Sequence, residues 1–400
     1  MHARQTLSYP SSGSDRQRIS LEAEAPKARS LPRASIAIFV AIVQAILLAG
    51  HLLVYETLHY FLPTPDPAAA AATQIAFALL SVSFVFASIL AFRYYNLVVR
   101  LFYTVASIWL GLFNFLFLAA LLCWLLYAAF TISHVDVSRP ALLSVLFGCA
   151  LLVGLYGLAN ASWIRVKRVS VKLPGLPNSW RGRSAALVSD THLGHVHGYG
   201  FISRVVAMLR QLRPDIVLIA GDVFDGTKVQ PKHLAAPWLH LSPPLGKFFV
   251  TGNHEEFSDP SQHLAALQQS GIRVLLDEKV VVDGLQLIGV TYHTLVSPER
   301  LRSALRSSAI EPHTASILLA HAPQNLSLVE QAGISLQLSG HTHRGQVFPF
   351  TWFTSRIFKE FTYGLNRLGA LTVYTSSGAG TWGPPMRVGS TPEIVLIHFE

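Results

Sequence analysis

Four long apolar runs fill the first part of the chain and narrow the choice of fold more than any other feature. They cover residues 34–55, 70–92, 103–130 and 140–163. Each reaches the ~20 residues that a helix needs to cross a bilayer, and none has the polar face expected of a buried helix in a soluble bundle. We therefore expect residues 34–163 to form a four-helix transmembrane anchor.

The composition agrees with a chain that lies partly in lipid. Of its 400 residues, 51% are hydrophobic and only 13% are charged, which is too apolar for an ordinary soluble enzyme. Cys123 and Cys149 both lie inside apolar runs, so neither a disulfide framework nor a cysteine-based zinc site is indicated. The run interiors hold no Asp, Glu, Lys or Arg, which favours an anchor over an ion pathway. His51, near the end of the first run, is interpreted as an interfacial residue.

Positive charge is distributed unevenly around these runs. Residues 1–33 are basic and Ser-rich without a signal-peptide core, so a disordered basic tail is expected. The first loop has no Lys or Arg, whereas six basic residues lie between positions 165 and 183. By the positive-inside rule, the tail and the C-terminal domain of this integral inner- or plasma-membrane protein are predicted to be cytoplasmic. The net charge of +9 forms no basic stripe interleaved with aromatics, so no nucleic-acid partner is expected.

Residues 164–400 have the pattern of a soluble α/β domain. Short apolar stretches at 185–189, 216–220 and 248–250 alternate with helix-like stretches at 201–211, 234–239 and 261–269. This alternation predicts βαβ units around a buried, mostly parallel sheet. Asp283 and Gly284 join two further apolar stretches, 279–282 and 285–290, and predict a hairpin with a tight primed turn.

Five of the expected strands are followed by polar segments that contain residues of the types that bind metal ions. The five groups are Asp190 and His192; Asp222 and Asp225; Asn253, His254 and Glu255; His321; and His341 and His343. Open α/β sheets place their ligands at this carboxyl end of the strands. Each group alone has an ordinary explanation as a turn, a helix cap or a core histidine, but five such groups in succession predict a metal centre.

This succession resembles the calcineurin-like metallophosphoesterase superfamily. The family pattern Asp-x-His, Gly-Asp-x-x-Asp, Gly-Asn-His-Glu/Asp, His, Gly-His-x-His is met between Asp190 and His343. The resemblance covers roughly residues 163–400 and says nothing about the four apolar runs. It implies a four-layer α/β/β/α sandwich, here preceded by four transmembrane helices.

The resemblance also implies a role for each residue of the pattern. One metal ion would be held by Asp190, His192 and His343, the other by Asn253, His321 and His341, with Asp222 bridging both. His254 would be the catalytic histidine and Asp225 the acid that orients it. Two such ions lower the pKa of a bound water and neutralise charge during displacement at phosphorus. A donor set of this kind accepts Mn, Fe, Zn or Ni, so the identity of the two divalent ions stays open.

The stretch 377–387 resembles a membrane-associated bacterial branch that includes phosphodiesterases and UDP-diacylglucosamine hydrolases. Trp382 and Arg387 would then be available to a substrate, although a structural loop that closes the sheet is an equal alternative. Where this branch commonly has Gly after the last metal histidine, this chain has Arg344. A guanidinium there either clamps a second phosphate or turns to solvent.

The sequence thus predicts a membrane-anchored two-metal phosphoesterase. It would hydrolyse a phosphodiester or pyrophosphate, with a lipid or nucleotide-linked lipid as one candidate, by metal-activated water. The alternatives are a phosphomonoesterase or protein phosphatase, and a membrane sensor that uses the same domain for binding without hydrolysis. The sequence leaves open the substrate, the oligomeric state and any role of the helices beyond anchoring.

Overall fold

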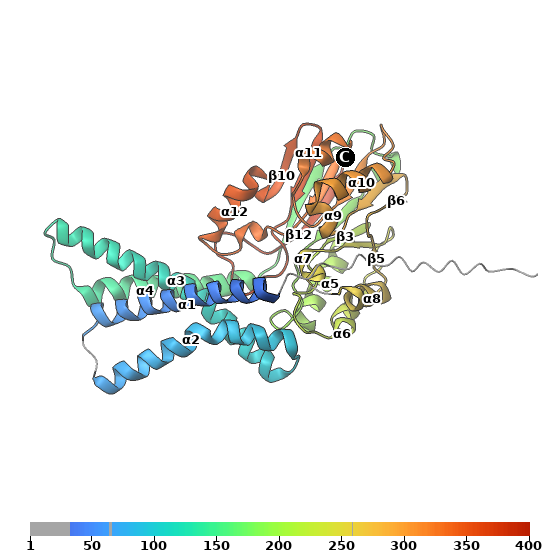
Figure 1. Cartoon of the computed structure of the whole chain (residues 1–400). Coiled ribbons are helices and arrows are strands. Elements are labelled where there is room, and N and C mark those ends of the chain that lie inside the picture. Colours follow the sequence, from blue (N-terminus) through green and yellow to red (C-terminus); the bar gives the residue numbers. More distant parts are fainter. Residues whose placement is uncertain (1–32, 64–65, 258) are drawn as a thin grey trace, which may run out of the picture.

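The computed structural model describes residues 33–400, apart from residues 64–65 and 258. Four helices open this part of the chain and lie together as a bundle (Figure 1): α1 (Arg33–Phe61), α2 (Pro67–Arg93), α3 (Leu97–Ile132) and α4 (Arg139–Ser162). All four are long and apolar enough to cross a membrane, as the sequence predicts. The expected basic tail, residues 1–33, lies outside the described residues except for the last one, where α1 begins.

Local sequence sets the starts of the middle two helices. Asp66 accepts hydrogen bonds from two backbone N–H groups in the first turn of α2, and Pro67 occupies the first helical position. Asn96 caps α3 by accepting from the backbone N–H of Val99 at 2.9 Å. With 36 residues, α3 is ~54 Å long, whereas the hydrocarbon core of a bilayer is ~30 Å thick. Part of α3 therefore extends beyond the bilayer.

The interpretation of His51 as an interfacial residue is wrong. Because α1 continues to Phe61, His51 lies inside the helix and is buried between its neighbours. Its ring stacks on Phe113 with 3.8 Å between centroids, and its Nε2 accepts from Trp109 Nε1 at 3.0 Å. Its Nδ1 donates to the carbonyl of Leu47 at 2.8 Å. A neutral imidazole thus satisfies both ring nitrogens, which makes this polar residue acceptable inside the bundle.

The C-terminal part of the chain contains two six-stranded sheets. The first has the order β1 (Arg165–Val171), β12 (Glu393–Phe399), β2 (Ser184–Val188), β3 (Ile216–Ala220), β4 (Lys247–Val250) and β5 (Arg273–Val274). Strands β2 to β5 are parallel, and β12 runs antiparallel to β2. The parallel strands β2, β3 and β4 are short, continuous apolar stretches because both faces of the sheet are covered.

The second sheet combines parallel and antiparallel pairs. Its order is β10 (Gly364–Leu368), β11 (Leu371–Thr375), β9 (Leu336–Ser339), β8 (Ser316–Leu319), β7 (Leu285–Gly289) and β6 (Glu278–Val282). Strands β6 and β7 pair antiparallel. Asp283 and Gly284 both have positive φ, 47° and 86°, as a primed turn requires. The predicted hairpin is confirmed.

Helices cover the outer face of each sheet, which completes four layers. The first sheet packs against α5 (Tyr199–Leu212), α6 (Pro231–Ala235) and α8 (Ser261–Gln269), and the second against α9 (Tyr292–Val296), α10 (Pro298–Ser307) and α11 (Leu326–Gln331). Between the sheets lies a core that includes Leu187 and Leu218 from one side and Leu287 and Leu338 from the other. The predicted α/β/β/α sandwich is confirmed.

The helical bundle is in direct contact with the sandwich. Asn114 of α3 donates through Nδ2 to the carbonyl of Phe348 at 2.9 Å. Gly111 lies so close to Met386 that an added Cβ would come within 2.5 Å of the Met386 sulfur. Two further hydrogen bonds join the two parts, from Arg100 Nε to the His195 carbonyl at 3.1 Å and from Lys228 N to the Ala91 carbonyl at 3.0 Å. The bundle is therefore packed onto the sandwich as well as covalently linked to it.

Candidate metal centre

The predicted ligands gather where strands of the two sheets end. Asp190 and His192 follow β2, and Asp222 follows β3. Asn253 begins α7 (Asn253–Glu256) just after β4, His321 follows β8, and His341 and His343 follow β9. Five of these non-glycine residues have left-handed backbone conformations: Asp190, His192, Asp222, His341 and His343, with φ between 45° and 72°. Such strained conformations cluster at functional sites, where the surrounding fold holds them.

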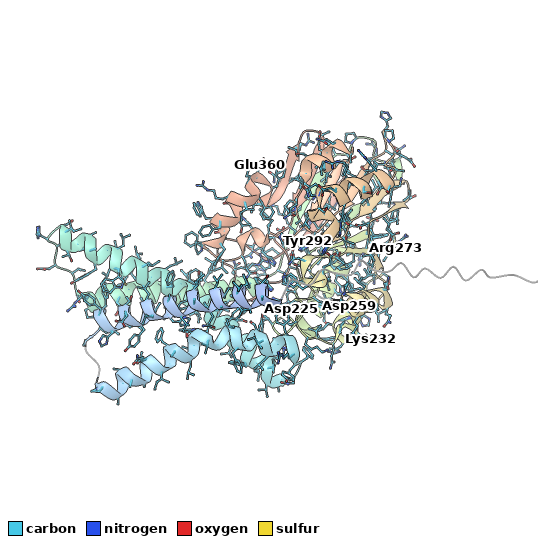
Figure 2. All side chains as sticks on the ribbon, in the orientation of Figure 1. Asp225, Lys232, Asp259, Arg273, Tyr292 and Glu360 are labelled. Atoms are coloured by element: carbon cyan, nitrogen blue, oxygen red, sulfur yellow. The ribbon has the colours of Figure 1, made fainter. Side chains whose placement is uncertain are left out.

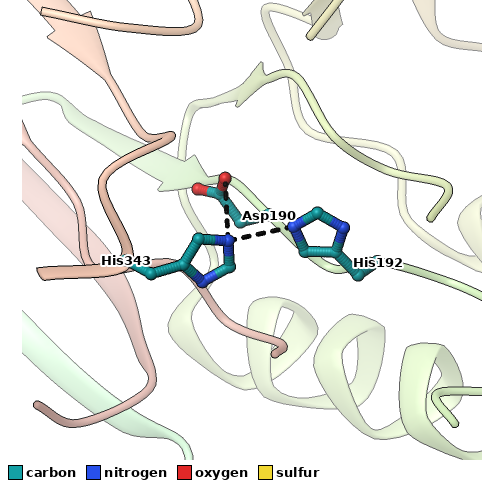
Figure 3. Close-up of side chains that lie close together, drawn as sticks. All are labelled: Asp190, His192 and His343. Atoms are coloured by element: carbon teal, nitrogen blue, oxygen red, sulfur yellow. Dashed lines mark hydrogen bonds and ion pairs between the residues drawn. The ribbon is translucent and has the colours of Figure 1, made fainter. Parts of the chain in front are cut away.

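The first group of donors consists of Asp190, His192 and His343, whose candidate ligand atoms all lie within 4.8 Å of one another. His343 Nε2 is 3.0 Å from His192 Nε2 and 3.5 Å from Asp190 Oδ1 (Figure 3). Asp190 and His192 are buried, and His343 is mostly buried. Two imidazole nitrogens and a carboxylate oxygen that point at one spot form a suitable set for a divalent transition metal.

The second group consists of Asp222, His321 and His341, again within 4.8 Å. His321 Nε2 lies 3.1 Å from Asp222 Oδ2, 3.2 Å from His341 Nδ1 and 3.1 Å from Asn253 Oδ1. Asp222 Oδ2 is also 3.8 Å from His192 Nε2 in the first group. Asp222 is thus the carboxylate that reaches both groups, and Asn253 adds an amide oxygen to the second.

Electrostatics at the centre favours a bound cation. Burial raises the pKa of Asp190 to about 6 and lowers the pKa values of His192 and His343. Burial alone would raise the pKa of Asp222, but the neighbouring histidines, His321 first, hold it below its usual range. Burial alone would lower the pKa of His321, but Asp222 and then Asp190 raise it to about 10. A positive charge beside the two carboxylates, from a proton on His321 or from a metal ion, stabilises their ionised forms.

His254 lies beside Asp222 and His192, and the candidate ligand atoms of these three residues lie within 4.8 Å of one another. Its Nε2 is 4.0 Å from Asp222 Oδ2, and its Nδ1 lies 2.8 Å from the backbone carbonyl of Asp225, to which it can donate. The Asp225 carboxylate was expected to orient His254 but binds Thr227 instead, accepting from its backbone N–H at 2.8 Å and from its hydroxyl at 2.5 Å. Asp225 therefore fixes His254 through its main chain. Asp225 lies where the sandwich meets the helical bundle (Figure 2).

Of the three predicted substrate contacts, Trp382 packs beside the proposed catalytic histidine, His254. Its half-exposed ring is 5.5 Å from the His254 ring, edge to face. Arg344 is exposed, but its guanidinium lies over the Tyr363 ring at 4.6 Å. The sequence pattern left this residue either clamping phosphate or turning to solvent, and the structure places it on an aromatic face at the rim.

Arg387 is fully buried and does not lie at the mouth of the site. Its guanidinium donates to the carbonyls of Gly380 at 2.5 Å and His343 at 3.2 Å, with further bonds to Gly378 and Ser390. We therefore assign it a positioning role behind His343. A buried arginine is a tertiary property, and nothing in the local sequence distinguishes it from an exposed one.

Two residues near the centre had no role assigned from the sequence. The buried Glu255 accepts from the backbone N–H groups of Asp222 at 2.9 Å, Phe224 at 3.0 Å and Gly252 at 2.9 Å, so it ties together the loops that carry Asp222 and Asn253. Its place three residues after a helix-capping glycine is the signal that points to this role. The ring of Tyr292, labelled in Figure 2, is 5.8 Å from the rings of both His321 and His341. No sequence pattern marks it.

Comparison with known proteins identifies the domain. The sequence pattern of the family described as calcineurin-like phosphoesterase matches residues 184–345. A transmembrane protein with metallophosphoesterase domain from Danio rerio is 33% identical over 284 residues, which are 66% of this chain and 63% of that protein. An uncharacterized metallophosphoesterase from Campylobacter jejuni is 31% identical over 59% of this chain and 63% of its own length.

The chain therefore spans somewhat less than two thirds of those two relatives. A third relative is matched almost end to end: an uncharacterized metallophosphoesterase from Aquifex aeolicus is 31% identical over 261 residues, which are 63% of this chain and 97% of that protein. The stretch matched by the family pattern, residues 184–345, contains the donor groups described above. The chain belongs to the calcineurin-like metallophosphoesterase family.

Proposed function

We propose that this protein is a membrane-anchored, two-metal phosphoesterase that hydrolyses a phosphodiester or a pyrophosphate at the bilayer surface. The observation that carries the proposal is the position of Asp222, whose carboxylate reaches both donor groups while His254 lies 4.0 Å away. Two divalent ions bridged by one carboxylate and flanked by a histidine are the arrangement used for in-line displacement at phosphorus.

In this mechanism Asp190, His192 and His343 would hold one ion, Asn253, His321 and His341 would hold the other, and Asp222 would reach both. When bound, the ions polarise the phosphoryl oxygens and lower the pKa of a bound water. The protein orients this histidine: the Asp225 carbonyl accepts from His254 Nδ1, so Nε2 faces Asp222. A protonated His254 Nε2 can then deliver a proton to the leaving oxygen.

The arginines near the centre favour a diester over a monoester. A terminal phosphate carries about two negative charges at neutral pH and is commonly clamped by arginine. Here Arg387 is buried behind His343, and Arg344 lies against Tyr363. The half-exposed Trp382 next to His254 instead offers an apolar surface to a second substituent on phosphorus.

We further propose that the sandwich faces the cytoplasm. The support is the distribution of positive charge, with basic residues concentrated before α1 and after α4 and none in the first loop. We favour a substrate at the bilayer surface because an enzyme that acts on freely soluble compounds does not need a membrane anchor of four helices.

A turnover screen tests the proposal. Purified full-length protein is stripped with chelator, reloaded with Mn and assayed on bis-p-nitrophenyl phosphate, p-nitrophenyl phosphate and nucleotide-linked pyrophosphates. Metal-dependent turnover should be fastest on the diester or the pyrophosphate. Faster turnover of the monoester would replace the proposal with a phosphomonoesterase or protein phosphatase, and full metal loading without any turnover would favour the binding-only sensor.

A further inference from the structure

One short helix between the bundle and the metal centre is almost entirely exposed. In α12 (Phe350–Phe358), none of the nine residues is buried. Phe350, Phe353 and Ile357 form an apolar stripe at the spacing of one helix face, with Trp352 beside it, and each side chain is about half exposed or more. A helix this short is unstable without packing. An apolar patch of this kind marks an interaction surface.

This helix connects the bundle to the metal centre. Just before it, Phe348 accepts a hydrogen bond from Asn114 of α3, and Val347 packs in a cluster with Phe115. At its other end, the ring of Phe358 lies 6.1 Å from the ring of the predicted ligand His341. Figure 1 shows α12 projecting from the sandwich on the side of the bundle. The residues before α12 thus contact the bundle, and its last residue lies beside a predicted ligand.

The position of the contact between Asn114 and Phe348 relative to the bilayer follows from the length of α3. From Asn114 to the end of the helix at Ile132, about 19 residues span ~28 Å, close to the ~30 Å thickness of the hydrocarbon core. Aromatic and basic residues typical of a membrane interface lie about two turns before this end. The Tyr60 ring is 4.8 Å from the Trp124 ring, and the Arg139 guanidinium lies over the Tyr60 ring at 5.0 Å. Asn114, and with it the start of α12, lies ten residues before Trp124, ~15 Å along the helix, and thus beside the part of α3 that is apolar enough to cross the bilayer.

The charged residues of α12 are also those expected of a helix in the membrane interface. Arg356 is exposed and lies over the Trp352 ring at 4.9 Å, and Lys359 follows directly after the helix. Basic residues beside an aromatic face are typical of helices that lie in the membrane interface and contact anionic headgroups. One acidic residue, Glu360, comes next in the chain (Figure 2).

We propose that α12 is an interfacial helix whose apolar stripe inserts into the bilayer, and that the metal centre takes a lipid phosphoester whose acyl chains stay against this stripe. The insertion of α12 rests on geometry alone. The assignment of a lipid substrate rests on the function proposed above. The occupant of the apolar face is membrane lipid, because the chain immediately before α12 already contacts a membrane-spanning helix.

Fluorescence quenching in reconstituted protein tests the insertion. Full-length protein with Cys123→Ala and Cys149→Ala receives Ile357→Cys, is labelled with an environment-sensitive fluorophore, and is placed in nanodiscs of phosphatidylcholine and phosphatidylglycerol. The matched control is Val281→Cys, an exposed apolar position on β6. Emission from position 357 should be blue-shifted, quenched severalfold more by spin-labelled lipid than emission from position 281, and protected from an aqueous quencher. Equal access of the aqueous quencher to both positions would overturn insertion.

A second probe guards against a local folding defect at position 357. Phe353→Cys lies one turn earlier on the same stripe and should give the same result. Thermal unfolding of each labelled protein in the nanodisc identifies any variant that has lost its fold. If both probes are folded and exposed to the aqueous quencher, α12 is not an interfacial helix.

Steady-state kinetics tests whether the substrate is a lipid phosphoester whose acyl chains contact α12. In the double variant Phe353→Ser and Ile357→Ser, KM for a vesicle-embedded lipid phosphodiester should rise roughly tenfold relative to KM for the soluble diester, because apolar area that contacts lipid is lost. Leu239→Ser with Val281→Ser, two exposed apolar positions elsewhere, should leave this ratio unchanged. An unchanged ratio in the α12 variant would overturn the lipid substrate. Loss of turnover on every phosphoester by the parent protein would instead refute the proposed function, while the quenching result would stand.

Discussion

Asn160, in the last turn of α4, donates a hydrogen bond to the backbone carbonyl of Arg387 at 2.8 Å, and Arg387 in turn donates through its guanidinium to the carbonyl of His343 at 3.2 Å. A residue of the helical bundle is thus two contacts away from a predicted metal ligand. Asn160 Nδ2 also donates to Ser390 at 3.0 Å. The bundle therefore helps to hold the loop behind the metal centre.

The first prediction concerns this contact. Asn160→Ala leaves two buried carbonyls without a donor and should lower the free energy of unfolding by ~1–3 kcal/mol. It should also lower kcat on a soluble diester, since the His343 loop is held less firmly. Thermal unfolding in detergent and steady-state kinetics measure the two effects. The exposed Asn178→Ala serves as the control, and identical behaviour of both variants would show that the contact has no influence on the site.

The second prediction separates metal binding from proton transfer. Because Asp222 reaches both donor groups, Asp222→Asn should remove activity and bound metal together. His254→Ala should reduce turnover on the order of 10²- to 10⁴-fold, the usual contribution of a general acid, and should keep metal content near that of the parent. Elemental analysis beside kinetics gives both quantities. Equal metal loss in the two variants would contradict the roles proposed for them.

The third prediction distinguishes a positioning residue from a substrate contact. Arg387→Lys cannot reproduce the guanidinium hydrogen bonds to His343, Gly378, Gly380 and Ser390, so the melting temperature and kcat should fall while KM stays nearly constant. Trp382→Ala removes a half-exposed ring beside His254 and should raise KM for an aromatic diester while the melting temperature stays constant. A rise in KM in Arg387→Lys without loss of stability would return Arg387 to the substrate surface.

Much of the metal centre was predictable because its donors follow strand ends in a fixed order. The strands are local apolar stretches, and parallel strands bring their carboxyl ends to one edge, so Asp190 and Asp222 were expected near each other. Contacts between distant segments were not predictable in this way. Arg387 lies in a loop that is held by Asn160, 227 positions earlier in the chain. The apolar stripe of α12 can be recognised in the sequence, but the sequence does not show what the stripe contacts.

The fourth prediction concerns topology. The charge distribution predicts that a reporter fused after Glu400 behaves as cytoplasmic and that one inserted at Pro63, in the loop between α1 and α2, behaves as external. Alkaline phosphatase and fluorescent-protein fusions give opposite signals on the two sides of the membrane. An external signal at Glu400 would place the sandwich on the other side and move the expected substrate to the outer leaflet.

The last prediction asks whether the bundle is more than a tether. A chain that begins at Ser162 keeps every predicted ligand but loses Asn160, and it exposes Met386, which is otherwise fully buried with α3 and α4. Burial of a Met side chain contributes roughly 1.5–3 kcal/mol, and buried carbonyls lose their donor as well. The shortened protein should therefore melt at a lower temperature and turn over even a soluble diester more slowly than the full chain in detergent. The variant Met386→Ser in the shortened protein removes the exposed apolar side chain and controls for aggregation. Full retention of kcat on the soluble diester would mean that the helices act as an anchor alone, because a tether changes access to lipid substrates without changing the chemistry at the metal centre.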